Sequence, residues 1–289
     1  MPGDTLILTD SCCDVPQYLA RKLGIRKIPV HVMYPEKDYL DGIDIDPQMV
    51  YDRFPGEIPT TSTPSITEIT DLFRSLEEEG IRKVLSIHIS EHLSSTVNMV
   101  RSVAKEFPSI RTFVFDTKNI SIGSGIYALY AAKKLNDGDD FDAVCESLER
   151  KKQDCTLMFY MDSLEYLHKG GRIGNVTYFL SDQLKIKPII ACDSEGIYRT
   201  VAKVRGGSHC GRARLFEEVF SQVENGTDDD VPCDIIIPYG GAKEEAQLLE
   251  EMIRSKKKNA NVLFQMQITA SMAVHTGPGL LGLCALRRD

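Results

Sequence analysis

The sequence predicts an α/β domain with a mainly parallel sheet, followed by an α+β domain with a mixed sheet. Three observations predict this class. In the first half of the chain, short apolar runs alternate with helix-length segments, which is typical of βαβ units. In the second half, two strand-like runs flank the turn sequence DSEG, which indicates a hairpin. The length of 289 residues suits two domains of medium size.

In the first half, hydrophobic spacing predicts each element in turn. We expect strands in TLILTD, RKIPVHVMY (interrupted by Pro29), KVLSIHIS and RTFVFDT, because each is a short apolar run. We expect helices in VPQYLARKLG, SITEITDLFRSLEEEG, STVNMVRSVAKEFP, SGIYALYAAKKLNDG and DFDAVCESLERKKQD. The polar segment 35–59 predicts an excursion with a short helix.

The second half predicts a sheet in which hairpins and helices are mixed. We expect a strand in CTLMFYMDS, a helix ending at the GGRIG turn, and a hairpin in KPIIACDSEGIYRTVAKV. Helices follow in RARLFEEVFSQVENG and AKEEAQLLEEMIRSKKK, and strands in CDIIIPYGG, VLFQMQIT and GLCALRR. The change of character falls near residues 152–155, so we expect domains at 1–153 and 154–289.

Composition and charge exclude several functions. The net charge is −8 without a dense Lys/Arg stripe, which argues against nucleic acid as a partner. No apolar run approaches the roughly 20 residues of a transmembrane helix, and the first residues lack a basic, apolar signal sequence. The eight cysteines are scattered without a CxxC pair, and the six histidines lack metal-ligand spacing. We therefore expect a cytoplasmic protein with reduced thiols and no metal or other cofactor.

Two clusters of hydroxyl side chains precede predicted helices. In PTTSTPSITE, either Thr63 before Pro64 or Ser65 with Glu68 is suited to cap the helix. Capping leaves Thr60, Thr61 and Ser62 unexplained, so these hydroxyls either face solvent or face a ligand.

The second cluster, ISEHLSSTVNM, poses the same alternative. Ser94 or Ser95 is suited to cap the next helix, and a helix N-terminus also favours an anion. We expect both clusters at the carboxyl ends of parallel strands, where open α/β sheets bind ligands.

The remaining motifs do not form a catalytic constellation. There is no G-x-S-x-G elbow, and His88 lies within a predicted strand, which argues against a serine hydrolase. GPGLLG matches G-x-G-x-x-G but lacks the βαβ unit of a dinucleotide site, so Gly277 and Gly279 are expected to let backbone pass close to another surface or a ligand. His275 precedes this turn. Arg172 is either surface charge or an anion clamp.

In their order along the chain, these motifs resemble the DegV family of fatty acid-binding proteins. The resemblance covers nearly the whole length, through TDSCCD, TSTPS, LSSTVN, VFDTKNISIGSG, LEYLHKGGRIG, LKIKPII and HTGPGLLG. One departure is visible, because Ser95 stands where the family commonly has Gly. A serine there either crowds the site or adds a hydrogen-bond donor.

The resemblance implies a Rossmann-like N-terminal domain, a mixed-sheet C-terminal domain and a fatty acid in an apolar tunnel between them. It places carboxylate-binding hydroxyls at Thr61 and Ser94, and the Arg and His of the family at Arg172 and His275. It implies palmitate, stearate or oleate as ligand, and a separate ATP-dependent fatty acid kinase subunit that phosphorylates the bound carboxylate for phospholipid synthesis. The protein is then a carrier rather than an enzyme.

Physical reasoning adds three expectations. Neutral hydroxyls can bind a carboxylate without pairing it with a full positive charge. A tightly ion-paired carboxylate would be a poor nucleophile toward ATP. An Arg172 guanidinium and a His275 imidazole that protonates near neutral pH would favour an acyl phosphate over a carboxylate. The small residues of SIGSGIYALYAA would leave room for the acyl chain, together with TLMFYMDSL and LKIKPII. The alternative function is an enzyme acting on a small carboxylated or phosphorylated substrate at the sheet edge.

Overall fold

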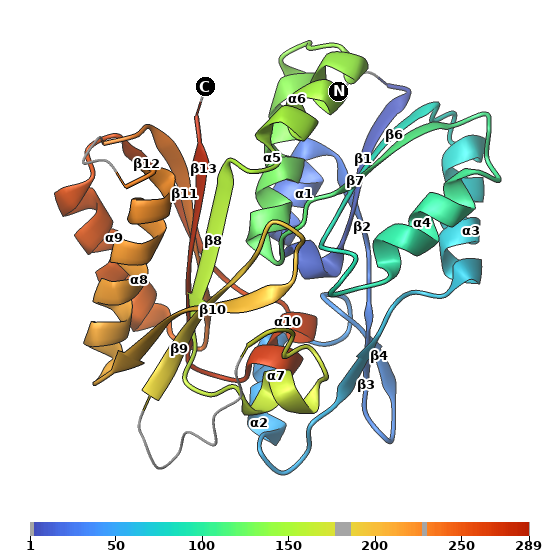
Figure 1. Cartoon of the computed structure of the whole chain (residues 1–289). Coiled ribbons are helices and arrows are strands. Elements are labelled where there is room, and N and C mark those ends of the chain that lie inside the picture. The colour runs from blue at the N-terminus through green and yellow to red at the C-terminus, as the bar shows by residue number, and fades with distance from the viewer. Residues whose placement is uncertain (1–2, 177–185, 227–229, 289) are drawn as a thin grey trace.

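The computed structural model describes residues 3–176, 186–226 and 230–288, and it confirms the predicted combination of a parallel and a mixed sheet (Figure 1). The first sheet has four parallel strands in the order β2-β1-β6-β7. Its strands are β1 (Thr5–Asp10), β2 (Ile25–Ile28), β6 (Lys83–His88) and β7 (Arg111–Asp116). Around it lie α1 (Gln17–Leu23), α3 (Ile66–Glu78), α4 (Thr96–Ala104), α5 (Ile122–Asn136) and α6 (Phe141–Lys151).

The second sheet has six strands in the order β10-β9-β8-β13-β11-β12, all antiparallel except the pair β11-β12. Its strands are β8 (Cys155–Tyr160), β9 (Ile186–Cys192), β10 (Tyr198–Arg205), β11 (Cys233–Gly240), β12 (Ala260–Gln267) and β13 (Leu280–Arg287). Its helices are α7 (Glu165–Lys169), α8 (Ser208–Val223), α9 (Lys243–Lys256) and α10 (Ala270–Thr276). The predicted hairpin is confirmed in β9 and β10, and the first two residues of LKIKPII lie outside the described residues.

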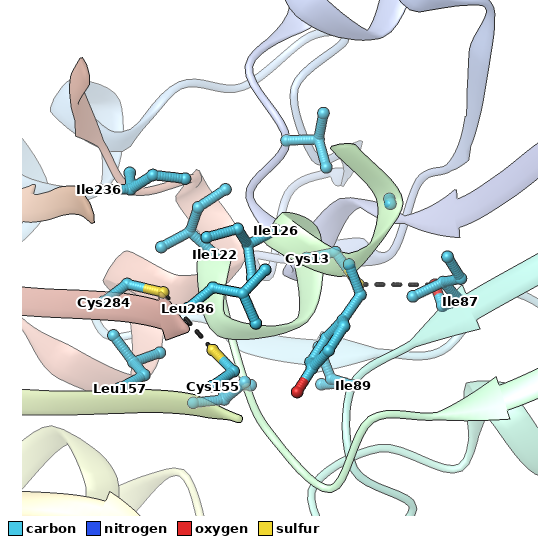
Figure 2. Packing of buried hydrophobic residues seen from close by; sticks show 14 of the residues in the cluster. Cys13, Ile87, Ile89, Ile122, Ile126, Cys155, Leu157, Ile236, Cys284 and Leu286 are labelled. Carbon is cyan, nitrogen blue, oxygen red and sulfur yellow. Dashed lines mark hydrogen bonds between the residues drawn. The ribbon is translucent and has the colours of Figure 1, made fainter. Parts of the chain in front are cut away.

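The two sheets share one apolar core, with α5 between them. α3 and α4 cover the outer face of the parallel sheet, and α8 and α9 cover the outer face of the mixed sheet (Figure 1). Figure 2 shows residues of this shared core from the first half of the chain, from α5 and from the second sheet: Cys13, Ile87, Ile89, Ile122, Ile126, Cys155, Leu157, Ile236, Cys284 and Leu286. A helix buried on all sides is apolar or small on all sides, as SIGSGIYALYAA is.

The chain leaves the parallel sheet at Pro29, so the interruption expected in RKIPVHVMY is confirmed, but its two parts are separate strands of different sheets and not one strand. Proline has no N–H to donate to a strand ladder, and the next N–H, of Val30, donates to Ser11 Oγ (3.1 Å) instead. A separate antiparallel sheet follows, in the order β4-β3-β5. It consists of β3 (His31–Met33), β4 (Asp38–Leu40) and β5 (Thr60–Ser62), with α2 (Pro47–Arg53) between the last two.

This small sheet changes the setting of the first hydroxyl cluster. Thr60 to Ser62 form an edge strand paired with β3, so the expectation that this cluster lies at the carboxyl end of a parallel strand is wrong. Of the two capping alternatives, Ser65 with Glu68 forms the capping box of α3. The second cluster does lie at the predicted edge, between β6 and α4.

The predicted boundary between residues 153 and 154 falls in the link from α6 to β8. α10, although late in the chain, packs on α2, β3 and β5 from the first half. Within the described ranges, no helix is long and apolar enough to cross a membrane.

Candidate functional site

A cavity of about 50 Å³ lies where the two halves of the chain meet. The first half contributes residues from the turn after β1, from the link between β2 and β3, from the end of β5, and from the loops after β6 and β7. The second half contributes residues from α7, from the turn after α7, from β10 and from α10. The lining residues are Cys12, Val30, Thr61, Ser62, Thr63, Ile89, Leu93, Ser94, Ile120, Leu167, Arg172, Tyr198, Ser271, Met272 and His275. A largely apolar wall with a few polar groups is typical of small-molecule sites.

The cavity brings together five of the eight residues that the sequence singles out. Thr61 and Ser62 come from β5, Ser94 from the loop before α4, Arg172 from the turn after α7, and His275 from α10. Thr61 and His275 are 214 positions apart in the chain, yet their side chains are in direct contact in the folded protein. Their contact with a ligand stays a prediction.

The other three residues lie outside the lining. Ser95 is exposed at the N-cap of α4. Gly277 and Gly279 have φ of 66° and 92°, and a Cβ would stand 2.3 Å from the Tyr166 ring at Gly277 and 2.6 Å from Asp162 Oδ2 at Gly279. The glycines therefore let the backbone pass close to another surface, and that surface belongs to the protein itself.

The contact between Thr61 and His275 is the central polar interaction of the cavity. Thr61 Oγ1 lies 2.7 Å from His275 Nε2. The other ring nitrogen, Nδ1, is buried, and it has no hydrogen-bond partner among the residues that the structure describes. Nδ1 lies over Gly170, where a Cβ would stand only 2.2 Å away. Glycine at position 170 is thus what allows the imidazole to lie in this place.

His275 is neutral at physiological pH. Burial, and to a smaller extent the nearby Arg172 guanidinium, lower its pKa from 6.5 to about 4. The expectation that this imidazole protonates near neutral pH is therefore wrong, because the ring is enclosed and faces a cation. A neutral imidazole can still donate one hydrogen bond and accept another.

Arg172 supplies positive charge to the cavity. Among the described residues, its guanidinium donates one hydrogen bond, from Nη1 to the carbonyl oxygen of Gly170 (2.8 Å). A guanidinium has five N–H donors, so this single contact leaves donors for an anion. The Arg172 side chain is half-buried, so its exposure lies between that of a surface charge and that of an enclosed anion clamp.

Ser94 lies at the carboxyl edge of the parallel sheet, as predicted. Its Oγ accepts from the Thr96 N–H (3.3 Å) at the start of α4 and lies 2.9 Å from Thr96 Oγ1. Ser95 occupies the N-cap position but makes no side-chain capping bond. Ser94 therefore combines a helix-start contact with a place in the cavity wall.

The sequence did not single out several lining residues. Ser271 and Met272 belong to α10, a seven-residue helix that was not expected in TASMAVHT. Tyr198 begins β10, and Cys12 lies in the short 3₁₀ turn Ser11–Cys13 after β1. Burial and the carboxylate of Asp10 raise the pKa of the Cys12 thiol well above its usual value, so it is a poor nucleophile. The TDSCCD motif was the signal that pointed to Cys12.

A second hydroxyl–histidine contact lies inside the parallel sheet. Ser86 Oγ is 2.7 Å from His88 Nε2, and His88 Nδ1 is 2.7 Å from Asp10 Oδ2. This order of groups matches that of a serine-hydrolase triad. The three side chains are 0–1% exposed, however, and a nucleophile must reach its substrate, so the geometry does not support hydrolysis. The Ser-x-His spacing, which places both side chains on one face of a strand, was the signal in the sequence.

The described residues contain no group of three or more His, Cys, Asp or Glu side chains arranged to hold a metal ion.

The fold and this cavity define a class: α/β proteins with two sheets that enclose a small-molecule site between the halves of the chain. A family model described as "Uncharacterised protein, DegV family" matches residues 4–288. The chain belongs to the DegV family, which confirms the resemblance. A DegV domain-containing protein of Clostridium acetobutylicum is 33% identical over 282 residues, 98% of each chain. Protein DegV of Bacillus subtilis is 26% identical over 281 residues, 96% of this chain and 97% of its own.

Solved structures confirm the fold. A DegV family protein from Thermus thermophilus, described as fatty acid-binding, has a TM-score of 0.87 with 32% identity, covering 99% of this chain and 100% of its own. DegV of Bacillus subtilis, a fatty acid-binding protein, has a TM-score of 0.86 with 26% identity over 99% of each chain. A stearic acid-binding protein from Eubacterium ventriosum has a TM-score of 0.85 with 25% identity over 97% of each chain.

Proposed function

We propose that this protein binds one long-chain fatty acid, such as palmitate, stearate or oleate, in the cavity between its two halves. The observation that carries the proposal is the lining, which combines hydroxyls, a neutral imidazole and one guanidinium with apolar side chains. The fatty acid-binding relatives support the same ligand class. Thr61, Ser94 and His275 would hold the carboxylate, and Ser62 and Arg172 would lie beside it.

The neutral groups suit a carboxylate that must remain reactive. Thr61, Ser94 and His275 can donate hydrogen bonds without adding charge, so the positive charge near the carboxylate comes from Arg172. Affinity would come mainly from the tail, since about 15 methylenes at roughly 0.8 kcal/mol each give about 12 kcal/mol gross. Association costs of about 4–15 kcal/mol offset much of this, so the head group mainly fixes the register of the chain.

The tail requires side chains to move. A cavity of about 50 Å³ is well below the roughly 300–1,000 Å³ of ligand pockets. The small residues of α5 do not supply the space, which corrects that expectation. A Cβ at Gly125 would stand 2.2 Å from the carbonyl oxygen of Cys13, and one at Gly123 would stand 2.9 Å from Leu157. These glycines allow close packing, so the flexible side chains of the lining, such as Met272, are the ones to yield.

We extend the proposal to a partner: an ATP-dependent fatty acid kinase that phosphorylates the bound carboxylate to an acyl phosphate for phospholipid synthesis in the cytoplasm. This part rests on the family resemblance. Within it, Arg172 favours the more highly charged acyl phosphate, whereas neutral His275 positions the carboxylate through Thr61. The chain itself would act as a carrier without catalytic groups of its own.

Two measurements test the proposal. Organic extraction and mass spectrometry of the purified protein should yield about one fatty acid per chain, and delipidated protein should bind added palmitate or oleate. No extracted fatty acid together with no binding would overturn the function. For the partner, Arg172→Ala should keep its lipid but lose most acyl-phosphate formation with a cognate kinase, and unchanged turnover would reject that role.

A further inference from the structure

Helix α10 brings Met272 and His275 to the cavity, yet its own residues do not cap its first turn. Two carboxylates from the first fifty residues of the chain take that place. Thr269 N–H donates to Asp14 Oδ1 (2.8 Å), and Ser271 N–H donates to Asp41 Oδ1 (3.2 Å). These contacts join residues 255 and 230 positions apart. The start of α10 is therefore held by the other half of the protein.

Both acids are buried, and each is also bonded to a part of the chain other than α10. Asp41 is 2% exposed, its second oxygen accepts from Ser271 Oγ (2.5 Å), and its N–H donates to the carbonyl of Val30 (2.9 Å). Asp14 is 1% exposed, and its second oxygen accepts from Ser121 Oγ at the start of α5. Asp14 is thus anchored through its side chain to Ser121, and Asp41 is anchored through its backbone to Val30.

The backbone around Asp14 is in an uncommon conformation. Asp14 and Ser121 have φ of 54° and 52°, and they are two of the four non-glycine residues with positive φ in the part of the chain that the structure describes. Their mutual hydrogen bond joins two such positions. Residues in this region persist only where the surroundings determine them, and they gather at functional sites.

The position of α10 decides the geometry of the polar end of the cavity. His275 is wedged between Thr61 Oγ1, 2.7 Å from Nε2, and the backbone of Gly170 below Nδ1. Cys12 also lines the cavity, and its thiol lies 3.5 Å from Ser271 Oγ. A displacement of the helix by about 1 Å is enough to break contacts of this kind.

We propose that Asp14 and Asp41 are positioning residues for the carboxylate site, which they set by holding the first turn of α10 in register with Thr61. The inference rests on the proposed function, because it concerns the same cavity. Neither acid lines the cavity itself. Their effect on a bound lipid passes through His275, so it concerns recognition of the carboxylate and not the affinity for the acyl tail.

The test uses the delipidated full chain with oleate and methyl oleate, two ligands that share a tail and differ in the carboxylate. Four single variants are compared: Asp14→Ala, Asp41→Ala, Asp14→Glu and Asp41→Glu. Glutamate keeps the carboxyl group but is one methylene longer. Asp140→Ala is the control, because Asp140 is the N-cap of α6, where it accepts from the Asp142 N–H (2.8 Å), and it makes no contact with α10 among the hydrogen bonds described.

We expect each alanine or glutamate variant to weaken oleate binding about tenfold and methyl oleate binding less than about twofold. Asp140→Ala should lower only the melting temperature. Equal losses for both ligands, or wild-type oleate affinity in a folded glutamate variant, would overturn the inference. If the alanine variants do not fold, the glutamate variants decide. A wild-type protein that binds neither ligand would instead reject the proposed function.

Discussion

Two hydroxyl–histidine pairs with the same 2.7 Å separation lie in different surroundings in this molecule. Ser86 and His88 are enclosed in the parallel sheet, where Asp10 takes the second ring nitrogen. Thr61 and His275 lie at the wall of the cavity, and the second nitrogen of His275 has no partner among the described residues. A hydroxyl–histidine pair alone does not identify a candidate site. Access of a ligand to the pair, and a ring nitrogen without a hydrogen-bond partner, are the features that distinguish one.

The largest effect is expected from breaking the enclosed pair. His88→Ala leaves the Asp10 carboxylate buried without its partner, which should lower the free energy of unfolding by about 3–5 kcal/mol. His275→Ala should cost less than half as much, because Thr61 is left only partly buried. Urea denaturation of both variants checks this. Equal losses would show that the two pairs are alike in their contribution to stability.

The second effect concerns pH. Burial raises the pKa of Asp14 to about 7, so its contribution to stability is present at acidic pH and is lost as pH rises through 7. The lowered pKa of His275, about 4, acts in the opposite sense, since its contribution is present above 6.5 and is lost as pH falls toward 4. The two trends oppose each other between pH 4 and 7.

Removing one of the two groups should therefore leave the pH dependence of the other group visible in the free energy of unfolding. Asp14→Asn should become less stable than wild type on going from pH 7 to pH 4.5, and His275→Gln should become relatively more stable, by up to about 3 kcal/mol in each case. Urea midpoints measured across this range provide the test, with the wild type as reference for all other carboxylates. Identical pH profiles of the three proteins would contradict both assignments.

A smaller effect is expected when the space beside the cavity histidine is filled. Gly170 has φ of −77°, which alanine adopts without strain, but its Cβ would collide with His275 Nδ1. Gly170→Ala should weaken oleate binding about tenfold, because the displaced ring no longer orients Thr61 toward the charged carboxylate. Gly56→Ala is the control, since its Cβ would meet only the Arg53 carbonyl at 3.6 Å. Oleate affinity within twofold of the control would contradict the placement of the ring.

The smallest effect is expected from a single hydroxyl. Thr61→Val keeps the shape of the side chain and removes the contact with His275, so oleate affinity should fall about threefold to tenfold, for a neutral hydrogen bond of about 0.5–1.5 kcal/mol. Thr60→Val changes the neighbouring exposed residue of the same strand and should leave the affinity unchanged. Isothermal titration of both variants separates these outcomes, and equal affinities would show that Thr61 does not contribute.

The sequence predicted the regular elements well where local signals and packing agree. TLILTD became β1, and SITEITDLFRSLEEEG became α3 with the Ser65–Glu68 capping box. The sequence did not predict that the residues after Pro29 belong to a different sheet. The missing N–H of Pro29 ends the first sheet, and the partner strands of the next sheet lie farther along the chain, at residues 38–40 and 60–62. Helix α10 was missed because its first turn is capped by Asp14 and Asp41, which no local pattern reveals.

The candidate site was predicted in part for a similar reason. Loop motifs and the family resemblance point to Thr61, Ser62, Ser94, Arg172 and His275, and all five line the cavity. The protonation of His275 was predicted wrongly, since burial and the adjacent guanidinium are properties of the folded protein alone. No local pattern links His88 to Asp10, because the two residues lie on different strands and are 78 positions apart in the chain.

The apolar core shared by the two sheets has a consequence for how cargo is exchanged. A hinge that swung the sheets apart would expose α5 and the side chains on both sides of it, at about 25 cal/mol for each Å² of apolar surface. Interfaces of this kind hold their parts rigidly. The residence time of a lipid should therefore be set by local opening of short elements such as α7 and α10, whose amide hydrogens would exchange faster than those of α5.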